Sequence, residues 1–216
     1  TNTVLHLLAI AYEAGVPIDL KLFNEISAKT PNLCHLAPAG PTHMPDLYAA
    51  GGIPAVQAEL AKAGLLDLDV PTVTGKTLGE NLDELKANGF YEHCQQLLDE
   101  ANARCGIKLT RADIIRPASD PIGTDGSIAI LKGNLAPEGC VIKHTACPKN
   151  MFEATLRAKP YDSEEACISA VLHGEVKPGD AIFIRYEGPR GSGMPEMFYT
   201  GEAICADPAL ASSVAL

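Results

Sequence analysis

The pattern of apolar residues changes near residue 108, and this change constrains the fold more than any other feature. Before it, apolar residues recur at helical spacing in segments that end at Gly or Pro, such as PAVQAELAKAG. After it come short β-rich runs separated by Gly and Pro turns, which are DIIRP, SIAILKGN, GCVIKHTA and DAIFIRYEG. We therefore predict an α/β chain with a helical part over residues 1–110. Residues 111–216 are expected to form a β-rich, barrel-like part with helices over 150–157 and 163–172.

A turn in the helical part carries two candidate substrate-binding residues. In TVTGKTLGEN, Thr77 and Glu80 have the spacing of a capping box, which predicts a helix that begins just after Lys76. Backbone amides at a helix start, together with the Lys76 ammonium, could hold a carboxylate, so Lys76 and Thr77 are candidates for that role. The letters GKT also end a phosphate-binding P-loop. That motif requires Gly at position 70, where this chain has Val70, so the nucleotide interpretation fails.

The run LKGNLAPEGCVIKH in the second part is also chemically suggestive. Lys132 and Asn134 flank Gly133, where a predicted strand breaks, and they offer an ammonium and an amide to an anionic or hydroxylated ligand. A β-bulge with solvated side chains would produce the same pattern. Both interpretations stay open on the sequence alone.

The loop RYEGPRGSGMPEM, residues 185–197, follows the apolar run AIFI and carries two carboxylates, Glu187 and Glu196. Its Gly and Pro residues predict a tight turn at a strand end. Glycine lets the backbone approach a ligand closely, and a carboxylate is a hard oxygen ligand suited to Mg²⁺. An ordinary surface turn with solvated glutamates is the alternative.

Charge and cysteine usage exclude several functional classes. Seventeen basic against 27 acidic residues give a net charge of −10 without a Lys/Arg cluster, so neither nucleic acid nor an anionic membrane is an expected partner. The seven cysteines include no CxxC pair, which argues against a zinc ribbon or a secreted disulfide framework and predicts reduced thiols in the cytoplasm. Cys34, His35 and His43 share one loop, but their spacing fits no standard metal site.

Six stretches resemble, in this order, blocks of the dihydroxy-acid dehydratase and 6-phosphogluconate dehydratase family. They are TNTVLHLLAIAYEAGVP, PAGPTHMPDLYAAGGIPAV, TVTGKTLGENL, SIAILKGNLAPEGCVIK, DSEEACISAVLHGEVKPGD and RYEGPRGSGMPEM. Two segments favour the sugar-acid branch, the aldonate dehydratases such as those for xylonate or arabinonate. These are HTACPKNMFEATLRAKPYDSEE, and RGSGMPEMFYT where amino-acid biosynthetic members have a GGPGMPEML-like run.

The resemblance implies a hydro-lyase that converts a 2,3-dihydroxy carboxylate, a sugar acid or a branched dihydroxy acid, into a 2-keto acid. In this family an iron–sulfur cluster acts as Lewis acid on the departing C3 hydroxyl, Mg²⁺ holds the substrate's carboxylate and C2 oxygen, and a serine alkoxide takes the C2 proton. The family's Mg²⁺ glutamate lies in GMPEM, which matches Glu196 here. Glu187 is then a neighbour that could orient the loop.

The same resemblance implies that the chain is an internal piece of a longer enzyme. It matches the end of the first α/β domain and most of the second, swivelling β/β/α domain. The serine base is expected beyond Leu216, and the cluster cysteines and remaining Mg²⁺ ligands before Thr1, so the piece alone should be inactive. A cluster-free ligand-binding or assembly module is the alternative. Family members are generally dimers or larger, which makes a homo-oligomer the expected state.

Overall fold

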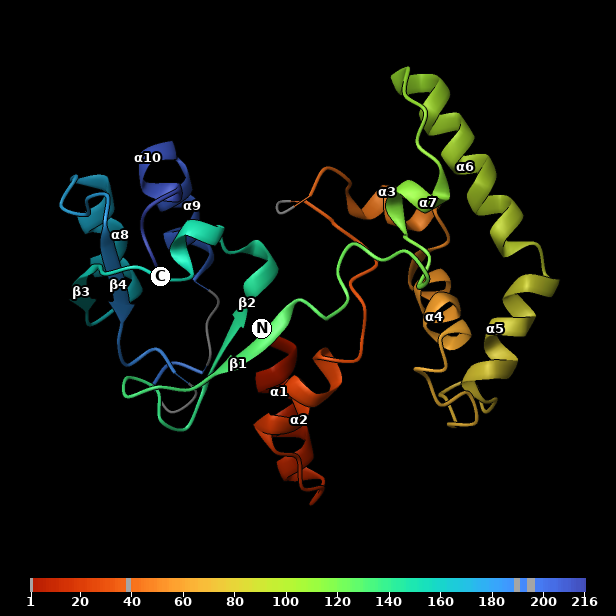
Figure 1. Cartoon of the computed structure of the whole chain (residues 1–216), viewed down its shortest axis with the longest axis horizontal. Coiled ribbons are helices and arrows are strands. Elements are labelled where there is room, and N and C mark those ends of the chain that lie inside the picture. Colours follow the sequence, from red (N-terminus) through yellow and green to blue (C-terminus); the bar gives the residue numbers. More distant parts are fainter. Residues whose placement is uncertain (1, 38–39, 189–190, 194–196) are drawn as a thin grey trace. The chain divides into compact units, whose positions relative to one another are not determined.

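A computed structural model of the chain describes residues 2–37, 40–188, 191–193 and 197–216 (Figure 1). It divides into two compact units, unit 1 with residues 1–146 and unit 2 with residues 147–216. Helices and 3₁₀ turns hold 45% of the described residues, and strands with isolated bridges hold 12%, so the chain is a mixed helix-and-sheet protein, as predicted. Within the described residues, no helix combines the length and the apolar character needed to cross a bilayer.

Unit 1 is mainly helical, as the spacing of apolar residues over residues 1–110 predicts. At the start of α5, Thr77 Oγ1 accepts a hydrogen bond from Glu80 N, and Glu80 Oε2 accepts one from Thr77 N. The predicted capping box is therefore confirmed. The helices are α1 (Asn2–Glu13), α2 (Leu20–Ser27), α3 (Met44–Ala49), α4 (Gly52–Lys62), α5 (Leu78–Ala87), α6 (Phe90–Cys105) and α7 (Arg111–Ile114).

A two-stranded antiparallel sheet completes unit 1, and helix α2 packs against one of its strands (Figure 1). Strand β1 (Ile128–Leu131) pairs with β2 (Cys140–Lys143), and the 3₁₀ turn η1 (His144–Ala146) follows. The amide of Asn24 donates to Ile130 O at 2.9 Å and accepts from Ile130 N at 2.7 Å. Ser27 Oγ donates to Ile128 O at 2.7 Å. These side chains satisfy backbone groups of β1 that a further strand would otherwise pair.

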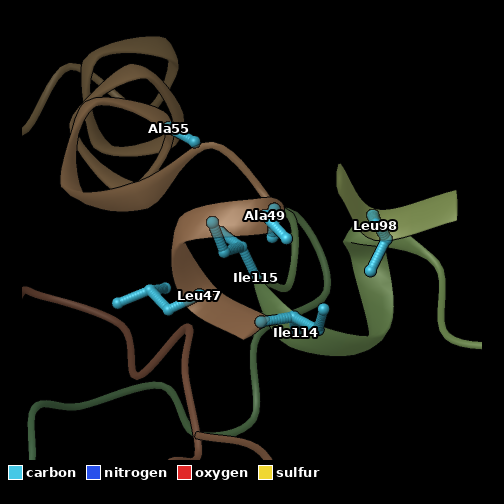
Figure 2. Packing of buried hydrophobic residues seen from close by; sticks show 7 residues of the cluster. Leu47, Ala49, Ala55, Leu98, Ile114 and Ile115 are labelled. Carbon is cyan, nitrogen blue, oxygen red and sulfur yellow. The ribbon is translucent and has the colours of Figure 1, made fainter. Parts of the chain in front are cut away.

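The core of unit 1 lies where α3, α4, α6 and α7 meet. Figure 2 shows Ile114 and Ile115 beside Leu47 and Ala49 of α3, with Leu98 projecting from α6. The prediction of a strand at DIIRP is wrong, because Asp113 and Ile114 end helix α7 and residues 115–117 follow it without forming a strand. Thr110 and Asp113 make a capping box at the start of α7. Ile114, its last residue, and Ile115, directly after it, are both buried. Two adjacent apolar residues are therefore accommodated without strand alternation.

Unit 2 is built on a parallel pair of strands joined through a helix. Strand β3 (Arg157–Tyr161) pairs with β4 (Asp180–Ile184), and α8 (Glu164–Leu172) connects them. Helices α9 (Phe198–Cys205) and α10 (Pro208–Ala211) follow. The apolar core gathers residues from α8, the connection between α8 and β4, β4, α9 and α10, namely Cys167, Ala170, Val171, Val176, Ile182, Ile204 and Leu210.

The helix predicted over residues 150–157 does not form. The 3₁₀ turn η2 (Lys149–Met151) occupies its start, and β3 begins at Arg157. Phe152 is largely exposed, so it adds no buried contact that would stabilise a helix here. The helix predicted at 163–172 is confirmed as α8, with Ser163 Oγ accepting from Ala166 N as the cap.

Strands do not dominate the second part of the chain in the way that the sequence suggested. In the described residues they form one antiparallel and one parallel pair, so the barrel-like swivelling domain stays a prediction. The two compact units divide between Ala146 and Cys147, whereas the pattern change in the sequence lies near residues 106–113. The domain boundary at residue 110 also stays a prediction.

Asp180, the first residue of β4, links the start of β4 to the start of β3 through hydrogen bonds of its side chain. Its buried carboxylate accepts hydrogen bonds from Lys177 N at 2.8 Å and from Arg157 Nε at 3.0 Å. The hydrogen bond from the Lys177 amide, with smaller help from the charge of Arg157, lowers the pKa of Asp180 below its ordinary value of 3.8. The folded state therefore binds this proton more weakly than the unfolded chain does.

We predict that this linkage makes unit 2 sensitive to acid. The stabilisation is fully present above about pH 4 and is lost as the pH falls through the lowered pKa. Asp180→Asn should lower the melting temperature at pH 7 and flatten its fall between about pH 5 and pH 2. Thermal unfolding followed by circular dichroism at each pH measures both effects. Parallel profiles for parent and variant would show that Asp180 does not carry the linkage.

Candidate functional site

In the loop that follows β4, residues 191–193 hydrogen-bond back to Gly188. The carbonyl oxygen of Gly188 accepts hydrogen bonds from the amides of Gly191, Ser192 and Gly193, at 3.0, 3.1 and 3.3 Å. Gly191 lies so close to the preceding backbone that a Cβ there would approach the Tyr186 carbonyl oxygen to 1.8 Å. Glycine is therefore required at position 191, as the sequence suggests for a loop whose backbone is closely packed.

Tyr186 stands at the entrance of this turn with an unusual backbone conformation. Its φ is 64°, and it is the only residue other than Gly with a positive φ in the part of the chain that the structure describes. The residue is 71% exposed, and the Arg185 guanidinium lies over its ring, 5.4 Å from the ring centroid. Arg185 Nε in turn donates to Asp162 Oδ1 at 2.7 Å. A strained aromatic held outward in this way marks the loop as a functional candidate.

Glu187 connects the turn to helix α8. One carboxylate oxygen accepts a hydrogen bond from Glu164 N at 3.2 Å, and the other accepts one from Ser192 Oγ. The hydroxyl of Ser192 and then the amide of Glu164 lower the pKa of Glu187, so this group is ionised at neutral pH. Both oxygens are thus engaged by donors of unit 2.

Glu196, the predicted Mg²⁺ ligand, lies outside the described residues. The described chain stops at Gly193 and resumes at Met197, directly before α9. The assignment of the metal to Glu196 therefore stays a prediction.

Lys132 and Asn134 follow β1 in unit 1. Lys132 lines an open pocket of about 490 Å³ that also contains Asp19 and Glu138, with Leu8, Pro17, Ile18 and Leu20 on the apolar side. Two carboxylates beside one ammonium give this pocket a net negative charge, which disfavours a substrate carboxylate there. Asn134 sits in the turn between Gly133 and Ala136, whose backbones exchange hydrogen bonds.

Lys76 and Thr77 have partners within their own segment. Lys76 Nζ lies 2.6 Å from Glu84 Oε2 on α5, and Thr77 caps the same helix. A network of side chains braces the turn from the other side, with Asn81 Nδ2 donating to Thr72 Oγ1 at 2.7 Å. A carboxylate bound here would have to compete with Glu84 for the ammonium. The substrate-binding role of these residues stays a prediction.

The residues that the structure describes assemble no metal centre by themselves. Among them, no group of three or more His, Cys, Asp or Glu side chains is placed to hold a metal ion. All seven cysteines are free thiols, and burial raises the pKa of Cys34, Cys94 and Cys167. Raised thiol pKa values oppose the thiolate form that metal ligation requires.

Two family models match the chain in order. The model described as dihydroxy-acid/6-phosphogluconate dehydratase N-terminal matches residues 1–81, and its C-terminal counterpart matches residues 113–216. The chain belongs to the dihydroxy-acid/6-phosphogluconate dehydratase family. The second match begins close to the boundary that the pattern change predicts, and it includes β1 to β4 and the whole loop after β4.

Curated relatives agree with this family assignment. The chain is 49% identical over its whole length to a dihydroxy-acid dehydratase of Maridesulfovibrio salexigens. It is 51% identical over 91% of its length to one of Solidesulfovibrio magneticus, and 48% identical over 94% to one of Carboxydothermus hydrogenoformans. The chain spans only 35%, 32% and 33% of the lengths of these relatives, respectively.

Several residues around the loop of this family member were not singled out by sequence reasoning. Glu164 N holds Glu187, and Glu164 Oε1 accepts from Thr200 N at 3.3 Å and from Thr200 Oγ1 at 3.1 Å. The sequence places Glu164 in the first turn of a capped helix. This position predicts only that its negative charge interacts favourably with the helix dipole. Nothing in the sequence signals the left-handed conformation of Tyr186.

Proposed function

We propose that the intact protein is a hydro-lyase that converts a 2,3-dihydroxy carboxylate into a 2-keto acid. The ordered match of the N-terminal and C-terminal family models along the chain carries this proposal. The reaction removes the C3 hydroxyl and the C2 hydrogen as water, and the resulting enol becomes the 2-keto acid. The names of the relatives, dihydroxy-acid dehydratases at 48 to 51% identity, support the same reaction class.

A branched dihydroxy acid is the first candidate substrate, because all three of these relatives are named for dihydroxy acids. A sugar acid is the second. The segment RGSGMPEMFYT, where amino-acid biosynthetic members resemble GGPGMPEML, favours it. The hydroxyl groups of a sugar acid need hydrogen-bonding partners in the binding site, whereas the methyl groups of a branched acid need an apolar surface. The kcat/KM values for the two substrates should therefore differ strongly.

The proposed cofactors are an iron–sulfur cluster as Lewis acid for the departing hydroxyl and Mg²⁺ for the substrate's carboxylate and C2 oxygen. Because the described residues form no ligand set for either, further ligands must come from other residues. Glu196 is our candidate for this chain's contribution to the Mg²⁺ site. Lys132, Asn134, Lys76 and Thr77 are candidate contacts to the substrate.

An assay with both substrate classes tests the function. We expect the full-length protein, purified without oxygen, to form a 2-keto acid from 2,3-dihydroxy-3-methylbutanoate with a kcat/KM at least about tenfold above that for xylonate or arabinonate. Derivatisation of the keto group with a hydrazine measures the product. The reverse preference would assign the protein to sugar acids, and no product from either class would refute the hydro-lyase proposal.

The competing proposal is a cluster-free ligand-binding or assembly module. Such a module would need no cluster ligands anywhere in the intact protein. The iron and sulfide content of the full-length protein discriminates between the two, because only the hydro-lyase requires a cluster.

A further inference from the structure

We propose that the open pocket at the start of α2 binds a small apolar α-amino acid in its zwitterionic form. The inference goes beyond the proposed function and does not depend on it. Lys132 and Glu138 would recognise the two charged groups of the ligand, and the apolar residues of the same pocket would hold its side chain.

The turn between β1 and β2 carries both charged side chains. Lys132 follows directly on β1, and Glu138 lies two residues before β2. Hydrogen bonds brace the turn between them. The amides of Gly133 and Ala136 donate to each other's carbonyl oxygens at 3.3 and 3.1 Å, and Gly139 N donates to Ala136 O at 3.1 Å. The two charges are therefore presented by one hydrogen-bonded turn.

The start of α2 packs closely against this turn. Gly139 has a φ of 115°, and a Cβ on it would lie 3.4 Å from both Leu20 Cδ1 and Ile130 Cγ2. Glycine suits both the backbone conformation and the close approach. The neighbouring Glu138 is thereby brought to the first residues of α2, where it lines the same pocket as Asp19 and Leu20.

Complementary charges in this pocket are left unused. Within the part of the chain that the structure describes, neither the Lys132 ammonium nor the Glu138 carboxylate has a hydrogen bond or an ion pair. A zwitterion can engage both at once, its carboxylate with Lys132 and its ammonium with Glu138. Asp19, which caps α2 by accepting from Lys21 N at 2.9 Å, adds attraction for the ammonium. It also disfavours a ligand that carries only a carboxylate.

The apolar side of the pocket favours an aliphatic side chain. It is formed by Leu8 of α1, by Pro17 and Ile18, and by Leu20 of α2. A cavity of about 490 Å³ with an apolar wall and a few charged groups is typical of small-molecule sites. Because the pocket is open and its charged side chains are exposed, solvent weakens each charge contact. We therefore expect a dissociation constant of about 1 mM.

Matched ligands and matched variants of the full-length protein test the site. Leucine carries all three recognised groups, whereas 3-methylbutan-1-amine lacks the carboxylate, 4-methylpentanoate lacks the ammonium and glycine lacks the side chain. Glu138→Gln removes the charge that faces the ammonium, and Lys132→Met removes the charge that faces the carboxylate. Glu100→Gln removes an exposed charge on α6, outside the pocket, and serves as the control.

Saturation-transfer NMR of each ligand measures its dissociation constant. Because Lys132 is also a candidate contact to the substrate, binding and not turnover is the readout. For the parent protein we expect the amine and glycine to bind at least about threefold more weakly than leucine, and 4-methylpentanoate not to bind detectably. Glu138→Gln should weaken leucine and the amine by at least about threefold, Lys132→Met should weaken leucine alone, and Glu100→Gln should weaken neither.

Three results would contradict the proposal. A folded parent protein without saturable leucine binding would overturn it, and so would 4-methylpentanoate binding as tightly as leucine does. Leucine binding that Glu138→Gln and Lys132→Met both leave unchanged would place the amino acid elsewhere on the molecule. None of these measurements requires 2-keto acid formation, so a failure of the hydro-lyase proposal is distinguishable from a failure of this one.

Discussion

Glu196→Gln in the full-length protein is expected to lower the rate of 2-keto acid formation by at least about a hundredfold, the scale of losing an electrostatic group at a developing oxyanion. Gln keeps the volume and one oxygen of Glu but loses the charge. Mg²⁺ requires near-octahedral oxygen coordination at short distance, so a site with few carboxylates depends strongly on each one. Glu196 lies outside the described residues, and the expectation rests on its match to the family's GMPEM glutamate.

The measurement compares kcat, half-saturating Mg²⁺ and iron content between parent and variant. Iron content and melting temperature should stay at the parent's values, because the proposed cluster ligands lie elsewhere. Glu202→Gln, an equivalent change of an exposed glutamate six residues further along, should behave as the parent does. A Glu196→Gln variant with normal Mg²⁺ dependence would show that the metal had been assigned to the wrong residue.

Leu98→Ala is expected to destabilise unit 1 by about 2 to 5 kcal/mol, the cost of removing a large side chain from a packed core. Leu98 is only 2% exposed and projects from α6 into the cluster that contains Leu47 and Ile114 (Figure 2). The short helices α3 and α7 have few other buried contacts to hold them, so the cavity would affect both.

Urea unfolding followed by circular dichroism measures this loss. Leu135→Ala is the matched control, since Leu135 is 75% exposed and its truncation should change the free energy of unfolding by less than about 0.5 kcal/mol. A loss below about 1 kcal/mol for Leu98→Ala, with an unchanged denaturant slope, would mean that this cluster is not the core of unit 1.

The helices of unit 1 were predictable because their signals are local. Asp19, Thr77 and Gly106 mark helix ends through capping and left-handed backbone, and each acts within a few residues of itself. The conformation of DIIRP depends on tertiary packing. Two adjacent isoleucines can be buried in a strand, or at the end of a helix that packs into a core, as here. Strand β3 had no local signal because Pro160 and two basic residues interrupt its apolar pattern.

In the candidate site, too, local sequence signals were readable and contacts made by packing were not. Resemblance singled out Glu196 as a ligand and Glu187 as its neighbour, both from a short run of letters. The partners of Glu187 come from α8 and from within the turn, and such contacts are set by the packing of unit 2. Lys76 and Thr77 were chosen for chemistry that Glu84 and α5 already engage, because a sequence shows which groups are present but not which are paired.

Proton NMR of the reaction in D₂O tests the proposed hydro-lyase activity, the elimination of water from a 2,3-dihydroxy acid. With the full-length protein, its cluster and Mg²⁺ present, we expect a 2-keto acid that has lost the C3 hydroxyl and carries a solvent deuteron at C3, where the enol is protonated. A folded, cluster-loaded protein that leaves every tested 2,3-dihydroxy acid unchanged, or yields a product that retains the C3 hydroxyl, would contradict the claim.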